Sequence, residues 1–309
     1  MTNGGSGDER LSKNQRREAA RDKARLLREQ QKKKDRRSRI ALQGGLIVVS
    51  LGIVAIVTVV IVTSIRPPSP GPLNMQSDGI TIGTDFEAVT TPALAAGGTP
   101  VETAPDAESG AIPIQIWLDY QCPVCNDFEK ANAEQIATLV TQGVATVEIH
   151  PVAILDRASL GARYSSRAAN AAACVSNYSP NSFYDFNAAL FANQPAEGTS
   201  GLTDEELIAV AGDVGVSSSN NISDCITDEN FKDWAADATE RATTNPALLS
   251  EAGSFGTPTV MVSGKRYTGS PSDSTAFAQF VAATDGEAFT EENSASPSPS
   301  PSPSPAPAQ

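Results

Sequence analysis

The chain has 309 residues and a formal net charge of −13, a length that fits one or two domains. The charge is unevenly distributed. Residues 1–39 contain 14 Lys and Arg against 6 Asp and Glu, whereas the remainder contains 9 against 30. The acidic remainder disfavours a nucleic-acid-binding function, because binding to phosphates requires concentrated positive charge. With His150 as the only histidine, two-histidine metal motifs are excluded.

The segment 40–65 follows the basic head and holds 26 residues without a charge. About 20 apolar residues cross a bilayer, so this segment predicts a transmembrane helix. A cleaved signal peptide is the rival, but its apolar region has about 7–15 residues and ends at a small-residue cleavage site, unlike Ser64–Pro68. We therefore expect a single-pass anchor in the cell membrane. Residues 1–39 would be a cytoplasmic topology signal, and the chain beyond the anchor would be extracytoplasmic.

Two low-complexity regions flank the rest of the chain. Residues 66–110 are rich in Pro, Gly, Thr and Ala and predict an extracytoplasmic linker, with one short strand near Ile80 and Ile82. Residues 286–309 consist largely of Ser, Pro and Ala, and predict a disordered tail that cannot form a core.

Residues 111–285 lie between these regions and predict one domain of mixed α and β elements. Its apolar pattern alternates in the expected strands and recurs at helical spacing in the expected helices. A helical block at about 157–245 separates the two halves. In chain order the pattern predicts a strand at 112–118, a helix at 122–142, a strand at 144–152, the helical block, a hairpin at 259–268 and a helix at about 272–283.

Two motifs carry chemistry. Cys122 and Cys125 form a Cys-x-x-Cys pair where a helix is expected to begin, and a helix N-terminus favours thiolate over thiol. This position predicts a redox-active dithiol. Far downstream, Thr257 and Pro258 precede a β-rich run, which predicts a cis peptide bond before a strand.

The other two cysteines, Cys174 and Cys225, lie in the helical block. Four cysteines allow three pairings, and a bridge between these two leaves Cys122 and Cys125 free for redox chemistry. We expect that structural disulfide. Free buried thiols, a second redox pair and a four-cysteine zinc site are the alternatives.

The stretch Asp119–Glu129, with Cys-Pro-Val-Cys at its centre, resembles the active-site stretch of DsbA-like thiol–disulfide oxidoreductases. Gly256–Thr259 resembles their cis-proline loop, and the helical block resembles their insertion. The expected membrane anchor, the Ala-rich insertion and the Ser-Pro tail resemble the membrane-anchored actinobacterial type of this family. The resemblance covers about residues 110–285. It implies an α/β, thioredoxin-like fold with a helical insertion, here preceded by one transmembrane helix.

The resemblance also implies roles for individual residues. Cys122 would be the exposed nucleophile and Cys125 the buried resolving thiol, while Thr257 and Pro258 would offer backbone groups to an extended substrate. Reduced exported proteins would be the substrates, and a membrane quinone reductase of the vitamin K epoxide reductase type the partner, with no bound cofactor. Val124 stands where the best-known member has His, so Cys122 is expected to be less acidic than in that protein.

These motifs leave three functional hypotheses. The first is an oxidase of cysteine pairs in exported proteins, the second a reductase or isomerase of the same fold, and the third a non-catalytic thioredoxin-like binding domain. Asp119 and Glu129 are candidates for proton transfer to Cys125, against a strand-end cap and a solvated helix face respectively. His150 is expected to have a structural or surface role.

Overall fold

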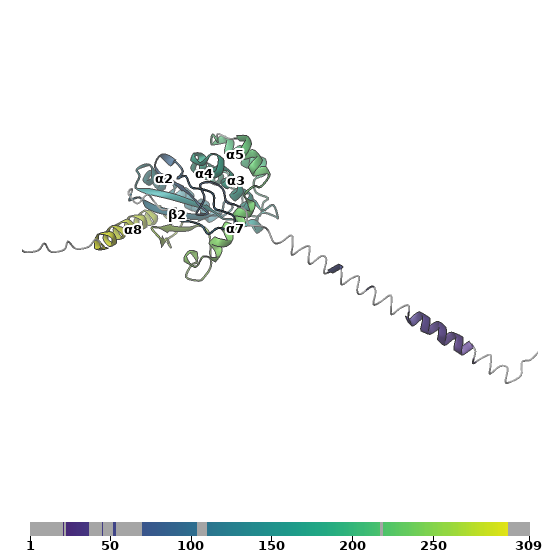
Figure 1. Ribbon diagram of the computed structural model, residues 1–309. Helices are drawn as coiled ribbons and strands as arrows, with labels where there is room; N and C mark the ends of the chain where they lie inside the picture. The colour runs from purple at the N-terminus through teal and green to yellow at the C-terminus, as the bar shows by residue number, and fades with distance from the viewer. Residues whose placement is uncertain are drawn as a thin grey trace, which may run out of the picture. The chain divides into compact units, whose positions relative to one another are not determined.

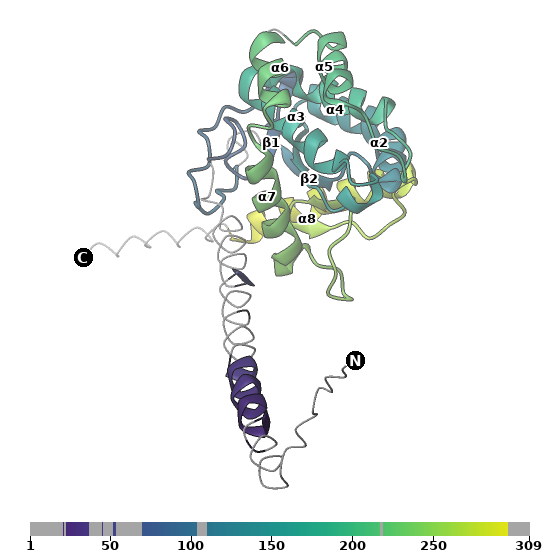
Figure 2. The same cartoon turned by 90° about the vertical axis from the view of Figure 1, so that its right-hand side faces the viewer.

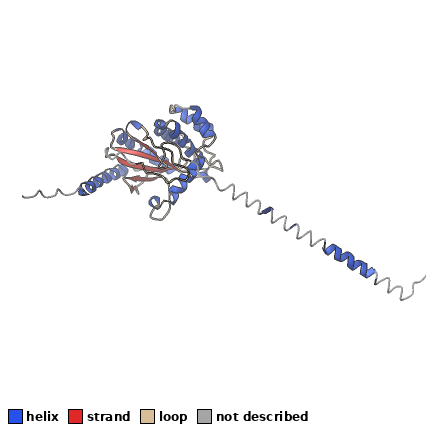
Figure 3. Ribbon diagram, viewed as in Figure 1, coloured by secondary structure: helices blue, strands red, loops and turns tan. Residues whose placement is uncertain are grey.

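The computed structural model describes residues 21, 23–36, 45, 52–53, 70–103, 110–216 and 219–295. The chain divides into two compact units, residues 1–67 and 68–309. The second unit contains a mixed β-sheet with helices packed around it, shown by secondary structure in Figure 3. It carries the expected cysteines and the expected cis-proline loop.

The sheet has five strands in the order β1-β3-β2-β4-β5. β2 and β3 are parallel, and the other neighbouring strands are antiparallel. The chain therefore returns from the far side of the helical block to place β4 directly beside β2. The strands are β1 (Ile80–Ile82), β2 (Ile112–Leu118), β3 (Ala145–Pro151), β4 (Thr259–Val262) and β5 (Lys265–Arg266).

The helices belong to two groups, visible in Figures 1 and 2. α2 and α8 contact each other, and α2 also contacts β3. The helices between β3 and β4 form the insertion, in which α3 contacts α4, α5, α6 and α7. The helices are α2 (Pro123–Thr141), α3 (Tyr164–Tyr178), α4 (Phe183–Ala192), α5 (Asp204–Asp213), α6 (Ser219–Thr227), α7 (Lys232–Thr244) and α8 (Ser274–Ala295), with short 3₁₀ turns at Thr84–Phe86, Asp156–Ala158, Pro180–Ser182 and Pro246–Leu248.

The core forms where the alternating pattern of β2 meets the apolar stripe of α2. Ile114 and Ile116 are buried on one face of β2, whereas Gln115 between them is half-buried on the other. Phe128 of α2 packs edge-on against Phe277 of α8, with ring centroids 5.3 Å apart. The helical spacing and strand alternation in the sequence thus predict the core side of these elements.

The final helix is longer than the sequence indicated. α8 continues to Ala295, so the first part of the predicted tail 286–309 is helical. The stretch from 286 to 295 contains Glu and Ala residues and no proline, and the first proline of the tail is Pro297. Proline ends helices because it lacks an N–H donor and clashes with the preceding turn, which agrees with an end before Pro297.

The predicted linker is also wrong over most of its length. Residues 70–103 fold onto the domain: Met75 is fully buried, Leu94 is 6% exposed, and β1 pairs with β3 at the sheet edge. The backbone N–H of Leu73 donates to Asn177 Oδ1 of α3 at 2.9 Å. Composition alone missed this because Pro- and Gly-rich chain can still fold when neighbouring elements satisfy its backbone groups.

A buried carboxylate fastens this N-terminal arm (residues 70–103) to α7. Asp78 accepts two hydrogen bonds from Arg241, at 2.6 and 2.7 Å, and one from Trp234 Nε1 at 3.2 Å. Asp78 is 7% exposed and Trp234 1% exposed, so the indole N–H has little access to water if the carboxylate is removed. A charged, fork-like pair of this kind is stronger than an ordinary surface ion pair.

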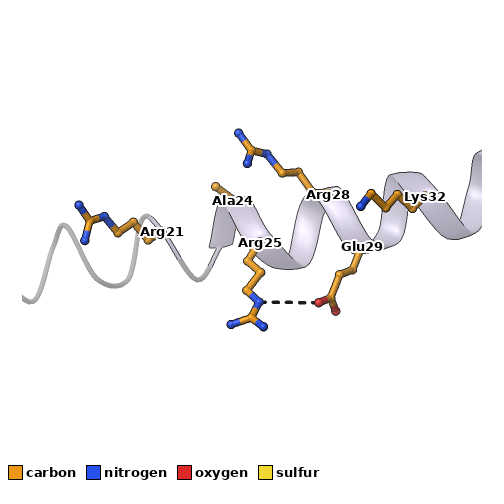
Figure 4. Close-up of a pocket in the computed structure, with 6 residues that line it drawn as sticks. All are labelled: Arg21, Ala24, Arg25, Arg28, Glu29 and Lys32. Atoms are coloured by element: carbon orange, nitrogen blue, oxygen red, sulfur yellow. Dashed lines mark ion pairs between the residues drawn. The ribbon is translucent and has the colours of Figure 1, made fainter.

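The first unit contains a helix over residues 23–36. On it Arg25 Nε lies 3.8 Å from Glu29 Oε1, one turn away, next to Arg28 and Lys32 (Figure 4). The predicted transmembrane segment 40–65 lies almost entirely outside the described residues. Among the residues that are described, no helix is both long and apolar enough to cross a membrane.

We predict that Asp78→Ala lowers the free energy of unfolding by about 2 kcal/mol, because it leaves the Trp234 N–H and the Arg241 guanidinium without their acceptor. Urea denaturation of the two proteins measures the difference. Glu87→Ala, which removes an exposed carboxylate of the same arm, is the matched control and is expected to change stability little. Equal effects of the two substitutions would show that the arm is not held through Asp78.

Candidate active site

The turn between β2 and α2 is organised by the side chain of Asp119. Its carboxylate accepts hydrogen bonds from the backbone N–H of Gln121 at 2.8 Å, the hydroxyl of Ser165 at 2.7 Å and the backbone N–H of Leu155 at 2.9 Å. Burial raises the pKa of Asp119 to about 6, although these donors oppose the shift. Its contacts fit a strand-end cap, the structural alternative for this residue.

Cys122 occupies the N-cap position of α2, and Pro123 is the first helical residue. Proline is favoured there because the first helical N–H has no partner within the helix in any case. The backbone N–H groups of Cys125 and Asn126 both bond to the Cys122 carbonyl, at 3.1 and 3.3 Å. The Cys-x-x-Cys spacing therefore places both thiols in the first turn of the helix.

The cis-proline loop faces Cys122 from the other half of the chain. The Thr257–Pro258 peptide bond is cis, and the Thr257 carbonyl lies 3.3 Å from Cys122 Sγ. β4 begins at the next residue and pairs with β2, in register from Trp117 opposite Thr259. The sheet thus brings together the two sequence motifs.

Several donors favour the ionised form of Cys122. The thiol of Cys125 hydrogen-bonds to its sulfur, and together with the Thr257 side chain and the backbone N–H groups of Cys125 and Val124 this lowers the Cys122 pKa from 9.0 to about 6, against the effect of burial. Val124 contributes its backbone only, since its side chain is 44% exposed and has no donor.

The two cysteines differ in ionisation but not in burial. Cys122 is 6% exposed and Cys125 2%. The sequence-based expectation of an exposed nucleophile is therefore wrong: the Thr257 carbonyl covers the Cys122 sulfur and leaves only a small accessible area. Burial raises the pKa of Cys125 well above its ordinary value. The dithiol thus combines one acidic and one protected thiol.

Glu129 does not lie on a solvated helix face. Burial raises its pKa to about 7, and its carboxylate accepts a 3.4 Å hydrogen bond from Asn187 Nδ2 of α4. Asn187 Oδ1 in turn accepts from the hydroxyl of Tyr120 at 3.1 Å. Glu129 is therefore part of a polar chain that ends beside the active-site turn.

One residue at the site was missed by the sequence reasoning. Gln194, just after α4, donates from Nε2 to the carbonyls of Tyr120 and Cys122, at 3.1 and 2.9 Å. Its Oε1 accepts from Asn126 Nδ2 at 3.0 Å. No motif contains Gln194, because its contact with the turn arises only from the packing of the insertion.

Cys174 and Cys225 form a disulfide that joins α3 to α6, with their Cα atoms 5.9 Å apart. Both are fully buried, and they cannot act as thiolate ligands of a metal. The structure does not bring them to Cys122 and Cys125, which are free thiols. The disulfide therefore links two helices of the insertion and is separate from the Cys122–Cys125 pair.

His150 lies on β3 and is 3% exposed. Its ring stacks on Trp117 at a centroid distance of 4.2 Å, and its Nε2 lies 3.4 Å from Glu148 Oε2. A Cβ atom at Gly79 would lie 2.6 Å from the ring, so only glycine fits there. Burial favours a higher pKa for Glu148, but His150 and hydrogen bonds from Ser77 and Gln115 lower it to about 2. These contacts agree with a structural role.

An acidic thiol at a helix N-terminus, a protected thiol one turn along and a cis-proline loop opposite them form a site for thiol–disulfide exchange. Fold and site together define a thiol–disulfide oxidoreductase. A family model described as thioredoxin matches residues 104–282, more than half of the chain, and the chain belongs to this family. The thioredoxin-like fold and the resemblance to DsbA-like oxidoreductases are thereby confirmed.

Solved structures similar to the chain include three bacterial proteins. Reduced DsbG of Mycobacterium tuberculosis is 28% identical, with 66% of this chain and 86% of that chain covered and a TM-score of 0.49. Reduced DsbA of the same organism is 26% identical, with 67% and 98% covered and a TM-score of 0.48. Oxidised BdbD of Bacillus subtilis is 18% identical, with 72% and 100% covered and a TM-score of 0.51, and shares the fold. No curated protein sequence matches the chain.

We predict that the thiolate absorbance of the reduced protein rises with a midpoint near pH 6. Because the folded pKa of Cys122 lies below its unfolded value, the ionised thiol stabilises the reduced fold above the unfolded pKa, and this stabilisation is lost as the pH falls through about 6. Cys122→Ser should remove the transition. A midpoint near the ordinary thiol value of 9.0 would contradict the assignment of Cys122 as the acidic thiol.

Proposed function

We propose that the protein is a membrane-anchored, extracytoplasmic thiol–disulfide oxidoreductase that oxidises cysteine pairs in exported proteins. The observation that carries the proposal is the asymmetry of the dithiol: Cys122 is acidic beneath Thr257, while burial keeps Cys125 protonated. This asymmetry determines which sulfur leaves and which one resolves.

The reaction begins with the Cys122–Cys125 disulfide. A substrate thiolate attacks Cys122 Sγ, the bond to Cys125 breaks, and Cys125 leaves and takes up a proton, since burial raises its pKa. The second substrate thiolate then attacks the substrate sulfur of the mixed disulfide, and Cys122 leaves as a thiolate. Two electrons have passed from the substrate dithiol to the enzyme, which is reduced. One substrate proton is now on Cys125, and the other is in solvent.

The low pKa of Cys122 supports the oxidising direction. A thiolate that is stabilised in the reduced protein lowers the energy of the reduced form, so the disulfide becomes a stronger oxidant. It also makes Cys122 a better leaving group in the second exchange. Thr257 and Pro258 lie beside the sulfur, where their backbone can align an extended substrate chain as an added strand would.

A reductase or isomerase of the same fold is the second candidate, and Val124 favours it. The Val124 side chain gives the Cys122 sulfur neither a hydrogen bond nor a positive charge, so the thiolate has one donor fewer than a His at this position would supply. A weaker oxidant exchanges disulfides without driving their net formation.

The extracytoplasmic location rests on two features. The uncharged run of 26 residues at 40–65 follows a basic head, which by the positive-inside rule stays in the cytoplasm. The buried Cys174–Cys225 disulfide supports this location, because disulfides persist in oxidising compartments. We propose that a membrane quinone reductase of the vitamin K epoxide reductase type removes the two electrons from Cys122 and Cys125, because each oxidation of a substrate leaves the pair reduced and it must be reoxidised before the next.

We predict that Cys122→Ser abolishes oxidation of a reduced, unfolded exported protein. Cys125→Ser, with Cys122 first converted to a mixed disulfide by oxidised glutathione, should instead accumulate a mixed disulfide with that substrate, whose thiolate displaces glutathione from Cys122. Without Cys125 no internal thiol can displace the substrate from Cys122. Non-reducing electrophoresis followed by mass spectrometry of the linked peptides identifies the sulfur involved. Adducts formed through Cys125 in the Cys122→Ser variant would reverse the assignment of the two roles.

The redox potential of the 122–125 pair decides whether the protein acts as an oxidase or as a reductase. It is measured by equilibrating the pair with glutathione. A potential near −120 mV, as in strongly oxidising members of the fold, supports the oxidase. A potential near −270 mV would replace it with the reductase.

We predict that the full-length protein sediments with membranes, and that protease added outside intact cells stripped of their wall digests residues 66–309 but not the basic head. The membrane would shield the uncharged segment 40–65 and the cytoplasmic residues 1–39 from the protease. Antibodies against each end report the fragments. A secreted product that starts near Arg66 would show that the segment is a cleaved signal instead.

A further inference from the structure

We propose that Gln194, together with Asn126, is a positioning residue for the exchange reaction at Cys122: it holds the backbone of the active-site turn in the geometry that directs the hydrogen-bond donors at the Cys122 sulfur. The inference rests on the function proposed above, and it assigns to the helical insertion a direct part in tuning the reactive thiol.

The Gln194 amide makes three hydrogen bonds at the site. Its Nε2 donates to the Tyr120 carbonyl at 3.1 Å and to the Cys122 carbonyl at 2.9 Å, on either side of Gln121. Its Oε1 accepts from Asn126 Nδ2 at 3.0 Å. An amide has two N–H donors, so both are used, and its planar geometry fixes the directions of all three bonds. Gln194 therefore joins the turn to the first turn of α2.

The Cys122 carbonyl is the point at which this contact affects chemistry. It also accepts the N–H groups of Cys125 and Asn126, so it defines the start of α2. The N–H groups of Val124 and Cys125 are among the groups that stabilise the Cys122 thiolate. Rotation of the Cys122 peptide would move the sulfur relative to these donors, and Gln194 opposes that rotation.

The insertion contacts Tyr120 at two places. Gln194 bonds to the Tyr120 carbonyl, and Asn187 of α4 accepts from the Tyr120 hydroxyl at 3.1 Å. Pro195 follows Gln194 and restricts its backbone to extended conformations, which limits how far the side chain can move. Tyr120 is fully buried, so the insertion holds this residue of the active-site turn by both its backbone and its side chain.

Loss of the Gln194 amide should raise the Cys122 pKa. Without it the Cys122 peptide gains freedom, the donors around the sulfur are less well aligned, and the thiolate is less stable. We expect Gln194→Ala to raise the pKa by about one unit, which corresponds to a roughly tenfold change in the ionisation equilibrium. Gln194→Glu should raise it further, because a carboxylate cannot donate to the two carbonyls and adds negative charge near the thiolate.

The test titrates the thiolate absorbance of the reduced full-length protein in detergent, together with the redox potential of the 122–125 pair. The variants are Gln194→Ala, Gln194→Glu and Asn126→Ala. Asn193→Ala is the matched control, because the neighbouring Asn193 is exposed and its side chain bonds only to Ala189 of its own helix. Asn126→Ala removes one of the three bonds and should raise the pKa in the same direction but less.

A raised Cys122 pKa and a lower potential in the Gln194 and Asn126 variants, with Asn193→Ala unchanged, support the proposal. The double variant should show less than the sum of the two single effects, since both substitutions remove the same hydrogen bond. Variants that unfold at lower temperature but keep the parent pKa and potential would overturn it, because the contact would then be structural only. A parent protein without an acidic Cys122 would instead refute the proposed function itself.

Discussion

The antiparallel pairing of β2 with β4 is the contact on which the active site depends. β2 ends in the turn that carries Cys122, and β4 begins directly after the cis-proline loop. Their register, from Ile114 opposite Val262 to Trp117 opposite Thr259, places the Thr257 carbonyl 3.3 Å from the Cys122 sulfur. All four residues of β4 are buried, and a one-residue slip would exchange the side chains on its two faces, so packing on both faces of the sheet fixes this register. The reactive thiol and its covering loop are therefore positioned by ordinary sheet packing.

Around this contact, burial and hydrogen bonding assign different chemistry to groups that are close in sequence. Cys122 is covered but surrounded by donors, so its pKa falls to about 6, whereas burial and the neighbouring Cys122 raise the pKa of Cys125. Burial raises the pKa of Asp119 to about 6 and that of Glu129 to about 7. The carboxylate of Asp119 is occupied by three donors, from Gln121, Leu155 and Ser165. Glu129 has a single long hydrogen bond from Asn187 and remains the better candidate for proton transfer.

The insertion stabilises the site as well as itself. The Cys174–Cys225 disulfide joins α3 to α6, and α4 with the residues after it reaches the active-site turn through Asn187 and Gln194. The N-terminal arm, residues 70–103, contacts the insertion at two places. Asp78 accepts from Arg241 of α7, and Asn74 Nδ2 donates to the Ser176 carbonyl of α3. These parts are distant from one another in the sequence, but all of them contribute to the main hydrophobic core together with the sheet.

The sequence by itself determined the strands and helices of the core, the thioredoxin-like fold and the dithiol. Strand alternation, helical spacing and the Cys-Pro-Val-Cys and Thr-Pro motifs are local patterns. They can be predicted because each depends on residues that are close in the sequence. The tertiary structure decided what depends on distant partners. Burial of Cys122 beside Thr257, the contact of Glu129 with α4 and docking of residues 70–103 each require a neighbour that no local pattern specifies. Gln194 is the clearest case, because an isolated glutamine has no signature until packing brings it to two carbonyls of the active-site turn.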